Sequence, residues 1–219
     1  MSRRRGSAQK ERGLALTELI IVVAIGLIVT AMAVPQFISI RRNARSLGDS
    51  RDINSNILLA KMRAAARFSM SRVYFDLAAG TFRTEIWNQT ATATCAANTW
   101  CTEGGATPLS QGVNFGFGAL ALAPGCPLAC TQPAIAQAPF CRPGTAGPPP
   151  NPVGGGDIAN TACIMFNSRG IPVDNTRNPF GNGAIYITDT VSVYGSTVSA
   201  TGQTQAWRSD QAAANWYRR

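Results

Sequence analysis

RGLALTELIIVVAIGLIVTAMAVP, residues 12–35, is the stretch that decides the fold of this 219-residue chain. Residues 19–34 are all apolar except for glycine and one threonine, and the run approaches the roughly 20 residues that a membrane-spanning helix needs. A single carboxylate, Glu18, stands at the head of the run. Because a charge costs about 2.5–3.5 kcal/mol at the centre of a bilayer, Glu18 is expected to have a function.

The register of this stretch resembles the class III signal of type IV pilins and type II secretion pseudopilins. In that family a basic leader ends in glycine, a hydrophobic residue follows, and the fifth mature residue is glutamate. Here Gly13 precedes Leu14, Glu18 is fifth from Leu14, and Pro35 stands where the family often places a helix-kinking proline. The resemblance implies that residues 1–13 are a leader, that a prepilin peptidase cuts between Gly13 and Leu14, and that it N-methylates Leu14.

Two other interpretations of the N-terminus compete with this one. An ordinary secretory signal peptide would be cut after Ala33, at the Ala-Met-Ala sequence, but Glu18 then falls where its apolar core should begin. A plain transmembrane anchor would be oriented by an excess of Lys and Arg on one side of the span. The flanking charge is nearly balanced, with five Lys/Arg before the span and four arginines soon after it, so the preference for an inside N-terminus is slight.

Positive charge gathers on one element after the apolar run. Loss of residues 1–13 would lower the formal net charge from +9 to +5, since five Lys/Arg and Glu11 are removed. Most of the remainder comes from Arg41, Arg42, Arg45, Arg51, Lys61, Arg63, Arg67 and Arg72, set against Asp49 and Asp52. A basic helix beside a membrane usually meets anionic head groups or acidic neighbours in an assembly.

The composition argues against an enzyme. The chain has no histidine, which excludes Ser-His-Asp and Cys-His catalysis and every His-ligated metal site. Asp174, Asp189 and Asp210 stand in sequences typical of turns, and the glycine run at residues 154–156 lacks the Lys-Ser/Thr of a phosphate-binding loop. We therefore expect a structural protein with no cofactor and no metal.

The cysteines predict disulfide bonds. An even number of cysteines in an exported chain favours disulfides, and Cys95 and Cys101 enclose a loop short enough for a local bond. The other four allow three pairings, and a zinc site is the less favoured alternative because their spacing is irregular. The six candidates are Cys95, Cys101, Cys126, Cys130, Cys141 and Cys163.

The rest of the chain predicts an α+β fold. Apolar residues at helical spacing continue beyond the first run, which predicts one helix from about residue 16 to about residue 68, kinked near Pro35. Residues 14–40 would be its membrane or filament-core half, and residues 41–68 its amphipathic half. Alternating short runs predict an antiparallel β domain over residues 69–208, with strands at 71–77, 82–87, 113–120, 162–166, 183–188, 191–194 and 197–200. Residues 95–157 are rich in Cys, Pro and Gly and are expected to form an insertion poor in regular structure.

The β-domain sequence resembles the GspH/FimT branch of minor pilins and pseudopilins, at CIMFNSRGIPV (163–173), GAIYITD (183–189) and VSATGQ (198–203). That resemblance implies an antiparallel sheet packed on the long helix. It also implies a subunit of a type II secretion pseudopilus or a type IV pilus, with other pilins in the filament tip or shaft and the inner-membrane assembly platform as partners. The subunit would first sit in the bacterial inner membrane, with its N-terminus cytoplasmic and its β domain periplasmic.

A DNA-binding pilin for natural transformation is the second hypothesis. Some FimT-like members resemble this, using basic residues near the C-terminus. The C-terminal tail, residues 209–219, interleaves arginines with aromatics, a pattern that suits single-stranded nucleic acid. The competing interpretation is a last strand that ends near Trp207, followed by a frayed tail with no binding role. The candidate contacts are Arg208, Trp216, Tyr217, Arg218 and Arg219.

Overall fold

The computed structural model describes residues 16–118, 120, 137–181 and 183–218. The chain forms two compact units, Met1–Arg41 and Arg42–Arg219. The first unit contributes the beginning of a helix, and the described part of the second contains the rest of that helix and a set of strands.

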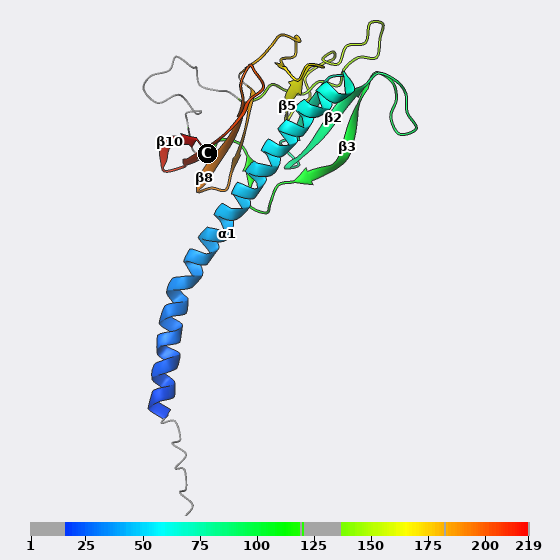
Figure 1. The fold of residues 1–219 in the computed structure, drawn as a ribbon. Coiled ribbons are helices and arrows are strands. Elements are labelled where there is room, and N and C mark those ends of the chain that lie inside the picture. The colour runs from blue at the N-terminus through cyan, green and yellow to red at the C-terminus, as the bar shows by residue number, and fades with distance from the viewer. Residues whose placement is uncertain (1–15, 119, 121–136, 182, 219) are drawn as a thin grey trace, which may run out of the picture. The chain divides into compact units, whose positions relative to one another are not determined.

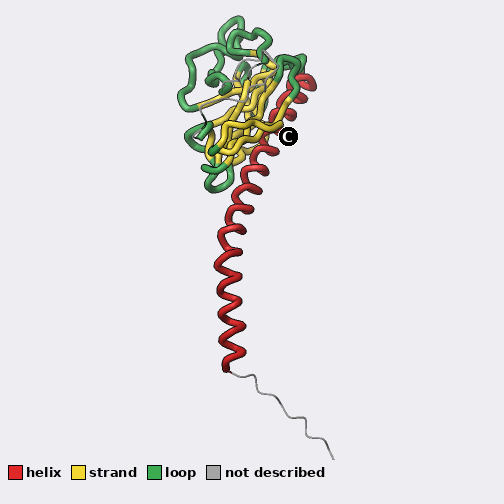
Figure 2. Tube along the Cα trace, turned by 90° about the vertical axis from the view of Figure 1, so that its left-hand side faces the viewer, coloured by secondary structure: helices red, strands yellow, loops and turns green. Residues whose placement is uncertain are grey.

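Helix α1 runs from Leu16 to Arg67 as one continuous helix, close to the predicted extent (Figure 2). Glu18 in its first turn and Arg67 in its last turn carry charges that complement the helix dipole. Phe68 takes a positive φ of 48° directly after the helix, the left-handed conformation that commonly ends helices. The helix continues through Pro35, and the kink expected there stays a prediction.

Within the described residues, ten strands form two five-stranded sheets, and every strand pair in them is antiparallel. The first sheet has the order β3-β2-β1-β5-β6, built from β1 (Ser71–Asp76), β2 (Thr81–Asn88), β3 (Thr99–Pro108), β5 (Thr161–Phe166) and β6 (Pro172–Val173). The second has the order β10-β9-β8-β7-β4, built from β4 (Asn114–Phe115), β7 (Gly183–Thr188), β8 (Ser192–Val198), β9 (Thr204–Asp210) and β10 (Ala213–Arg218). The α+β fold predicted from the sequence is confirmed, with two sheets in place of one.

The main core lies between the second half of α1 and the inner faces of both sheets (Figure 1). The helix contributes residues at helical spacing that are at most 1% exposed: Ile53, Ile57, Ala60 and Ala64. Phe75 on β1, Phe166 on β5 and Ile187 on β7 belong to the same cluster. Alternate residues of a strand point to opposite faces, so the remaining strand residues need cover of their own.

The outer face of each sheet is covered by a different segment. On the first sheet, Tyr74, Cys163 and Met165 pack with Cys141 and Val153, which come from the predicted insertion. On the second sheet, Tyr186 and Val193 pack with Leu120, and Phe117 and Trp216 lie against that cluster. The insertion and the C-terminal residues are therefore built into the fold.

Two strand predictions in the middle of the chain were wrong. Strand β3 was expected to be irregular insertion, but it forms ten residues of edge strand beside β2. The side chains of β3 are half-buried or exposed. Its sequence therefore lacks the alternation of apolar and polar residues that predicts a strand. The strand expected at 113–120 is only Asn114–Phe115, because Gly116 and Gly118 take positive φ values of 133° and 59°.

A third correction concerns β8, which was expected as two strands separated near Gly195. The strand is continuous because Gly195 is a packing residue and does not interrupt it. An added Cβ there would lie 2.7 Å from Cε1 of Tyr186 on the neighbouring strand. The glycine makes room for the buried tyrosine ring.

The expected frayed tail is also wrong. Residues 213–218 form strand β10, which pairs with β9 in an antiparallel hairpin. The amide of Gln211 donates to the carbonyl of Val191 at 2.8 Å and fixes the hairpin turn. Trp216 then lies edge-on to Tyr186, with ring centroids 5.8 Å apart, which supplies the buried contact that holds the strand.

Candidate assembly site

The apolar half of α1 is exposed along its described length. Its large apolar side chains between residues 16 and 40 are 47% to 76% exposed. Soluble monomers rarely expose contiguous apolar patches larger than a few hundred Å². Among the described residues, α1 contains one stretch that is long and apolar enough to cross a membrane. This surface needs lipid or the apolar surface of another protein around it.

Glu18 is the single charged side chain between residues 16 and 40. It is exposed and lies in the first turn of α1, where a negative charge is favoured by about 0.3–1 kcal/mol. The hydroxyl of Thr30 in the same segment donates to the carbonyl of Gly26 at 2.7 Å, so it needs no outside partner. Gly13 and Leu14 lie outside the described residues, and processing and methylation there remain predictions.

Two disulfides join described residues in the middle of the chain. The predicted Cys95–Cys101 bond is present, with a Cα–Cα distance of 6.1 Å. The second bond joins Cys141 to Cys163 on β5, with a Cα–Cα distance of 5.0 Å, and so selects one of the pairings that the sequence left open. Cys126 and Cys130 lie outside the described residues. No group of three or more metal-ligating side chains gathers within the described ranges.

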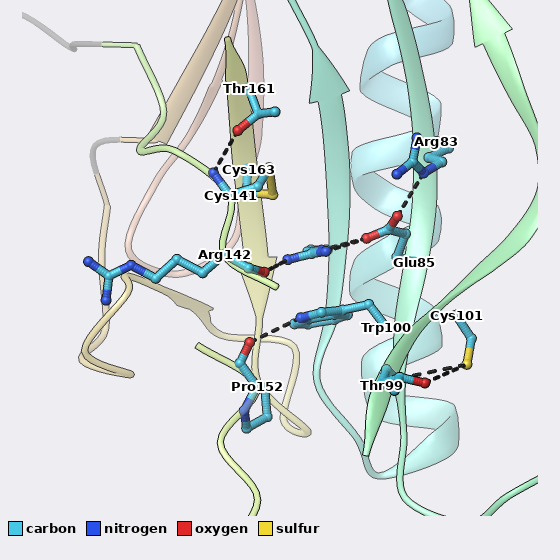
Figure 3. A network of polar contacts seen from close by, with 11 residues as sticks. Arg83, Glu85, Thr99, Trp100, Cys101, Cys141, Arg142, Pro152, Thr161 and Cys163 are labelled. Atoms are coloured by element: carbon cyan, nitrogen blue, oxygen red, sulfur yellow. Dashed lines mark hydrogen bonds and ion pairs between the residues drawn. A yellow bond between two sulfur atoms is a disulfide. The ribbon is translucent and has the colours of Figure 1, made fainter. Parts of the chain in front are cut away.

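A buried ion pair supports the outer face of the first sheet. Nη2 of Arg72 on β1 lies 2.6 Å from Oε2 of Glu85 on β2, and both side chains are about 5% exposed or less. Arg83 donates from Nε to the other oxygen of Glu85 at 2.7 Å (Figure 3). Burial lowers the pKa of Arg72, and the attraction of Glu85 opposes that shift. Removal of Glu85 would leave the charge of Arg72 buried without its ion-pair partner.

The same arginine fastens the insertion to the sheet. Nη1 of Arg72 donates to the carbonyl of Arg142 at 2.5 Å, and its guanidinium lies 4.1 Å from the ring centroid of Trp100 on β3. Trp100 in turn donates from Nε1 to the carbonyl of Pro152 at 3.0 Å (Figure 3). Together with the Cys141–Cys163 bond, these contacts hold residues 141–153 as a fixed layer over the first sheet.

The candidate nucleic-acid residues divide into two groups. Arg208 is engaged within the hairpin, where Nη2 lies 3.1 Å from Oδ1 of Asp210, and Trp216 is half-buried against Tyr186. Burial raises the pKa of Tyr186 above its usual range. Tyr217 and Arg218 are exposed, and Arg219 lies outside the described residues. The structure therefore does not present the aromatic and basic residues as one open surface.

Two of the three carboxylates that looked like turn residues in the sequence, Asp174 and Asp189, act as turn residues, and Asp210 does not. Oδ1 of Asp174 accepts hydrogen bonds from the amides of Thr176 and Asn178, at 2.8 and 3.0 Å. Asp189 closes the β7–β8 turn in the same way. Asp210 is the last residue of β9, and its carboxylate forms an ion pair with Arg208 on the same strand.

Comparison with solved structures finds a structural similarity. The structure resembles that of the minor pseudopilin EpsH from the type 2 secretion system of Vibrio cholerae. The two chains share 13% sequence identity with a TM-score of 0.40, and the similarity covers 74% of this chain and 95% of that chain. No protein-family model matches the sequence. No curated protein matches it either.

Proposed function

We propose that this chain is a minor pilin or pseudopilin subunit of a filament built at the bacterial inner membrane. The observation that carries the proposal is the exposed apolar run of α1 with one carboxylate, Glu18, at its head. A membrane anchor alone would need no charge there, and a charge in such a position is a functional hypothesis by default.

The apolar half-helix would serve two surroundings in turn. Residues 14–40 lie in the bilayer before assembly and then enter the core of the filament beside the same segments of neighbouring subunits. The exchange costs little, because lipid tails and apolar helices are similarly hydrocarbon-like. The basic leader, residues 1–13, holds the N-terminus in the cytoplasm until prepilin peptidase removes it.

Glu18 would set the axial position of each subunit. N-methylation of Leu14 leaves a positively charged amine, and the carboxylate of a neighbouring subunit can pair with it as the subunit enters. A charged pair in a medium of low dielectric constant specifies geometry more than it stabilises. Pro35 removes one helical hydrogen bond, which permits local bending during extraction from the membrane.

Filament incorporation of a Glu18→Val variant tests this role. We expect the variant to be inserted and processed, because valine is more hydrophobic than glutamate. We expect its recovery in sheared filaments to fall at least about tenfold, which corresponds to about 1.4 kcal/mol. Thr30→Val is the matched control, since it also replaces a polar side chain of the apolar segment with valine but removes no charge. Equal incorporation of both variants would exclude the ion-pair role.

A further inference from the structure

A cavity opens in the second unit beside the first residues of its helix. Its volume is about 320 Å³, and its walls come from α1, from the loop before β4 and from the β7–β8 turn. The residues that line it are Arg42, Arg45, Gln111, Gly112, Val113, Asp189 and Thr190.

Two arginines give the cavity its chemistry. Arg42 and Arg45 are three residues apart on α1, so they lie on the same side of the helix. Neither forms an ion pair with any acidic side chain in the described part of the chain. Arg45 makes one long hydrogen bond, from Nη1 to the carbonyl of Gln111 at 3.5 Å, which leaves most of its five N–H donors for a ligand. The arginine fork matches a phosphate group in shape and charge.

Residues in the next turn of α1 hold the two cavity walls that do not belong to the helix, which are the β7–β8 turn and the loop before β4. Oγ of Ser46 donates to Oδ2 of Asp189 at 2.7 Å, which ties the β7–β8 turn to α1. Asp49 accepts hydrogen bonds from the amide and the hydroxyl of Ser110, at 3.0 and 2.8 Å, which ties the loop before β4 to α1. The cavity is therefore formed before any ligand arrives.

Asp189 limits the charge of the ligand. Asp189 lines the cavity, and its two carboxylate oxygens accept hydrogen bonds from Ser46, Val191 and Ser192. Two arginines and one carboxylate favour an anion of one negative charge. A phosphate monoester carries about −1.5 to −2 at pH 7, whereas a phosphodiester carries a single charge. The cavity thus suits a phosphodiester better than free phosphate.

The position of the arginines along the helix identifies the source of that phosphodiester. This step rests on the proposed function, in which the apolar half of α1 spans the inner membrane. A helix of about 20 residues spans the roughly 30 Å of a hydrocarbon core, so a span that begins after Glu18 ends near Ile38. Arg42 and Arg45 follow that point by four and seven residues, so the chain itself keeps them within reach of the head groups.

We propose that this cavity binds the phosphodiester head group of a phospholipid in the outer leaflet of the inner membrane. The lipid holds the first residues of the β-domain unit at the bilayer surface before assembly. It is left behind when the subunit enters a filament, because the head-group layer does not follow the subunit.

Native mass spectrometry of the full chain in neutral detergent tests this site. The probes are dioctanoyl-phosphatidylglycerol, dioctanoyl-glycerol, which has the same chains without phosphate, and inorganic phosphate. We expect phosphatidylglycerol to bind at least about tenfold more tightly than either of the others. Arg42→Gln with Arg45→Gln should weaken that binding at least about tenfold. The control is Arg51→Gln with Arg169→Gln, which removes two exposed charges outside the cavity and should change binding less than about twofold.

Each other outcome overturns the assignment. Equal binding of dioctanoyl-glycerol would mean that acyl chains alone are recognised. Equal binding of inorganic phosphate would mean a free-anion site, and equal loss in both double variants would mean general charge attraction. Matching thermal unfolding of the two double variants shows that a loss reflects the cavity and not the fold. The assay does not depend on Leu14 methylation or filament entry, so its failure would leave the subunit proposal standing.

Discussion

Ser46 and Asp189 are 143 positions apart in the chain, and a 2.7 Å hydrogen bond from Oγ of Ser46 to Oδ2 of Asp189 joins them in the buried interior. The other oxygen of Asp189, Oδ1, accepts hydrogen bonds from the backbone amides of Val191 and Ser192, at 3.0 and 2.7 Å. One carboxylate therefore closes its own turn and also fastens that turn to the helix.

Substitution of Asp189 should destabilise the β domain. We expect Asp189→Ala to lower the free energy of unfolding by about 2–4 kcal/mol, because three donors lose their acceptor in a site that is 5% exposed. Asp52→Ala, at an exposed position of the same helix, should change it by less than about 0.5 kcal/mol. Urea unfolding of residues 42–219, followed by circular dichroism, measures both. Indistinguishable variants would mean that the turn is held by other contacts.

The buried pair of Arg72 and Glu85 should matter more than any surface pair. Glu85→Ala leaves the Arg72 charge buried without its partner, which should cost about 3–5 kcal/mol of unfolding free energy. The matched control is Glu103→Ala, since Glu103 pairs with Arg63 and Arg67 at the surface and should contribute about 1 kcal/mol or less. The same urea titration compares them. A larger effect at Glu103 would contradict the burial argument.

The disulfides should differ in strength because they close loops of different length. Cys141 and Cys163 are 22 residues apart, against 6 for Cys95 and Cys101. The loop-entropy relation gives about 3.4 and about 2.4 kcal/mol, so replacement of the first pair by serine should be the more damaging. Non-reducing peptide mapping should also return a third bond, between Cys126 and Cys130. Free thiols at those two positions would contradict the expectation of three disulfides.

Nucleic-acid binding by the C-terminal hairpin should be weak. Trp216 and Arg208 are used within the domain, which leaves Tyr217 and Arg218 as exposed contacts. We expect residues 42–219 to give no gel shift with a single-stranded oligonucleotide at about 0.15 M salt, where few phosphate contacts give little affinity. A shift that Arg218→Ala abolishes would favour the transformation hypothesis.

Strong periodic patterns were predicted well, and features that depend on distant partners were not. Helix α1 and strands β1, β2, β5 and β7 follow from apolar spacing that is local in the sequence. The β3 edge strand was missed because it is held by backbone bonding to β2 and buries little. Gly195 looked like a break because its role depends on Tyr186, which lies on the neighbouring strand.

The candidate site divides in the same way. Glu18 and the apolar run could be recognised from one stretch of sequence. The Arg42 and Arg45 cavity could not, because its other walls come from residues near 111 and 189. The Arg72 network likewise joins β1, β2, β3 and the insertion, whose proximity only the fold reveals.

Mass spectrometry of the mature protein tests the central claim most directly. Protein recovered from membranes of the native host, or of a host that carries a prepilin peptidase, would be digested and its N-terminal peptide sequenced. We predict that the chain begins at Leu14 and that its α-amine carries one methyl group. A chain that begins at Val34 would indicate ordinary secretion, with the apolar segment removed, and would contradict the account.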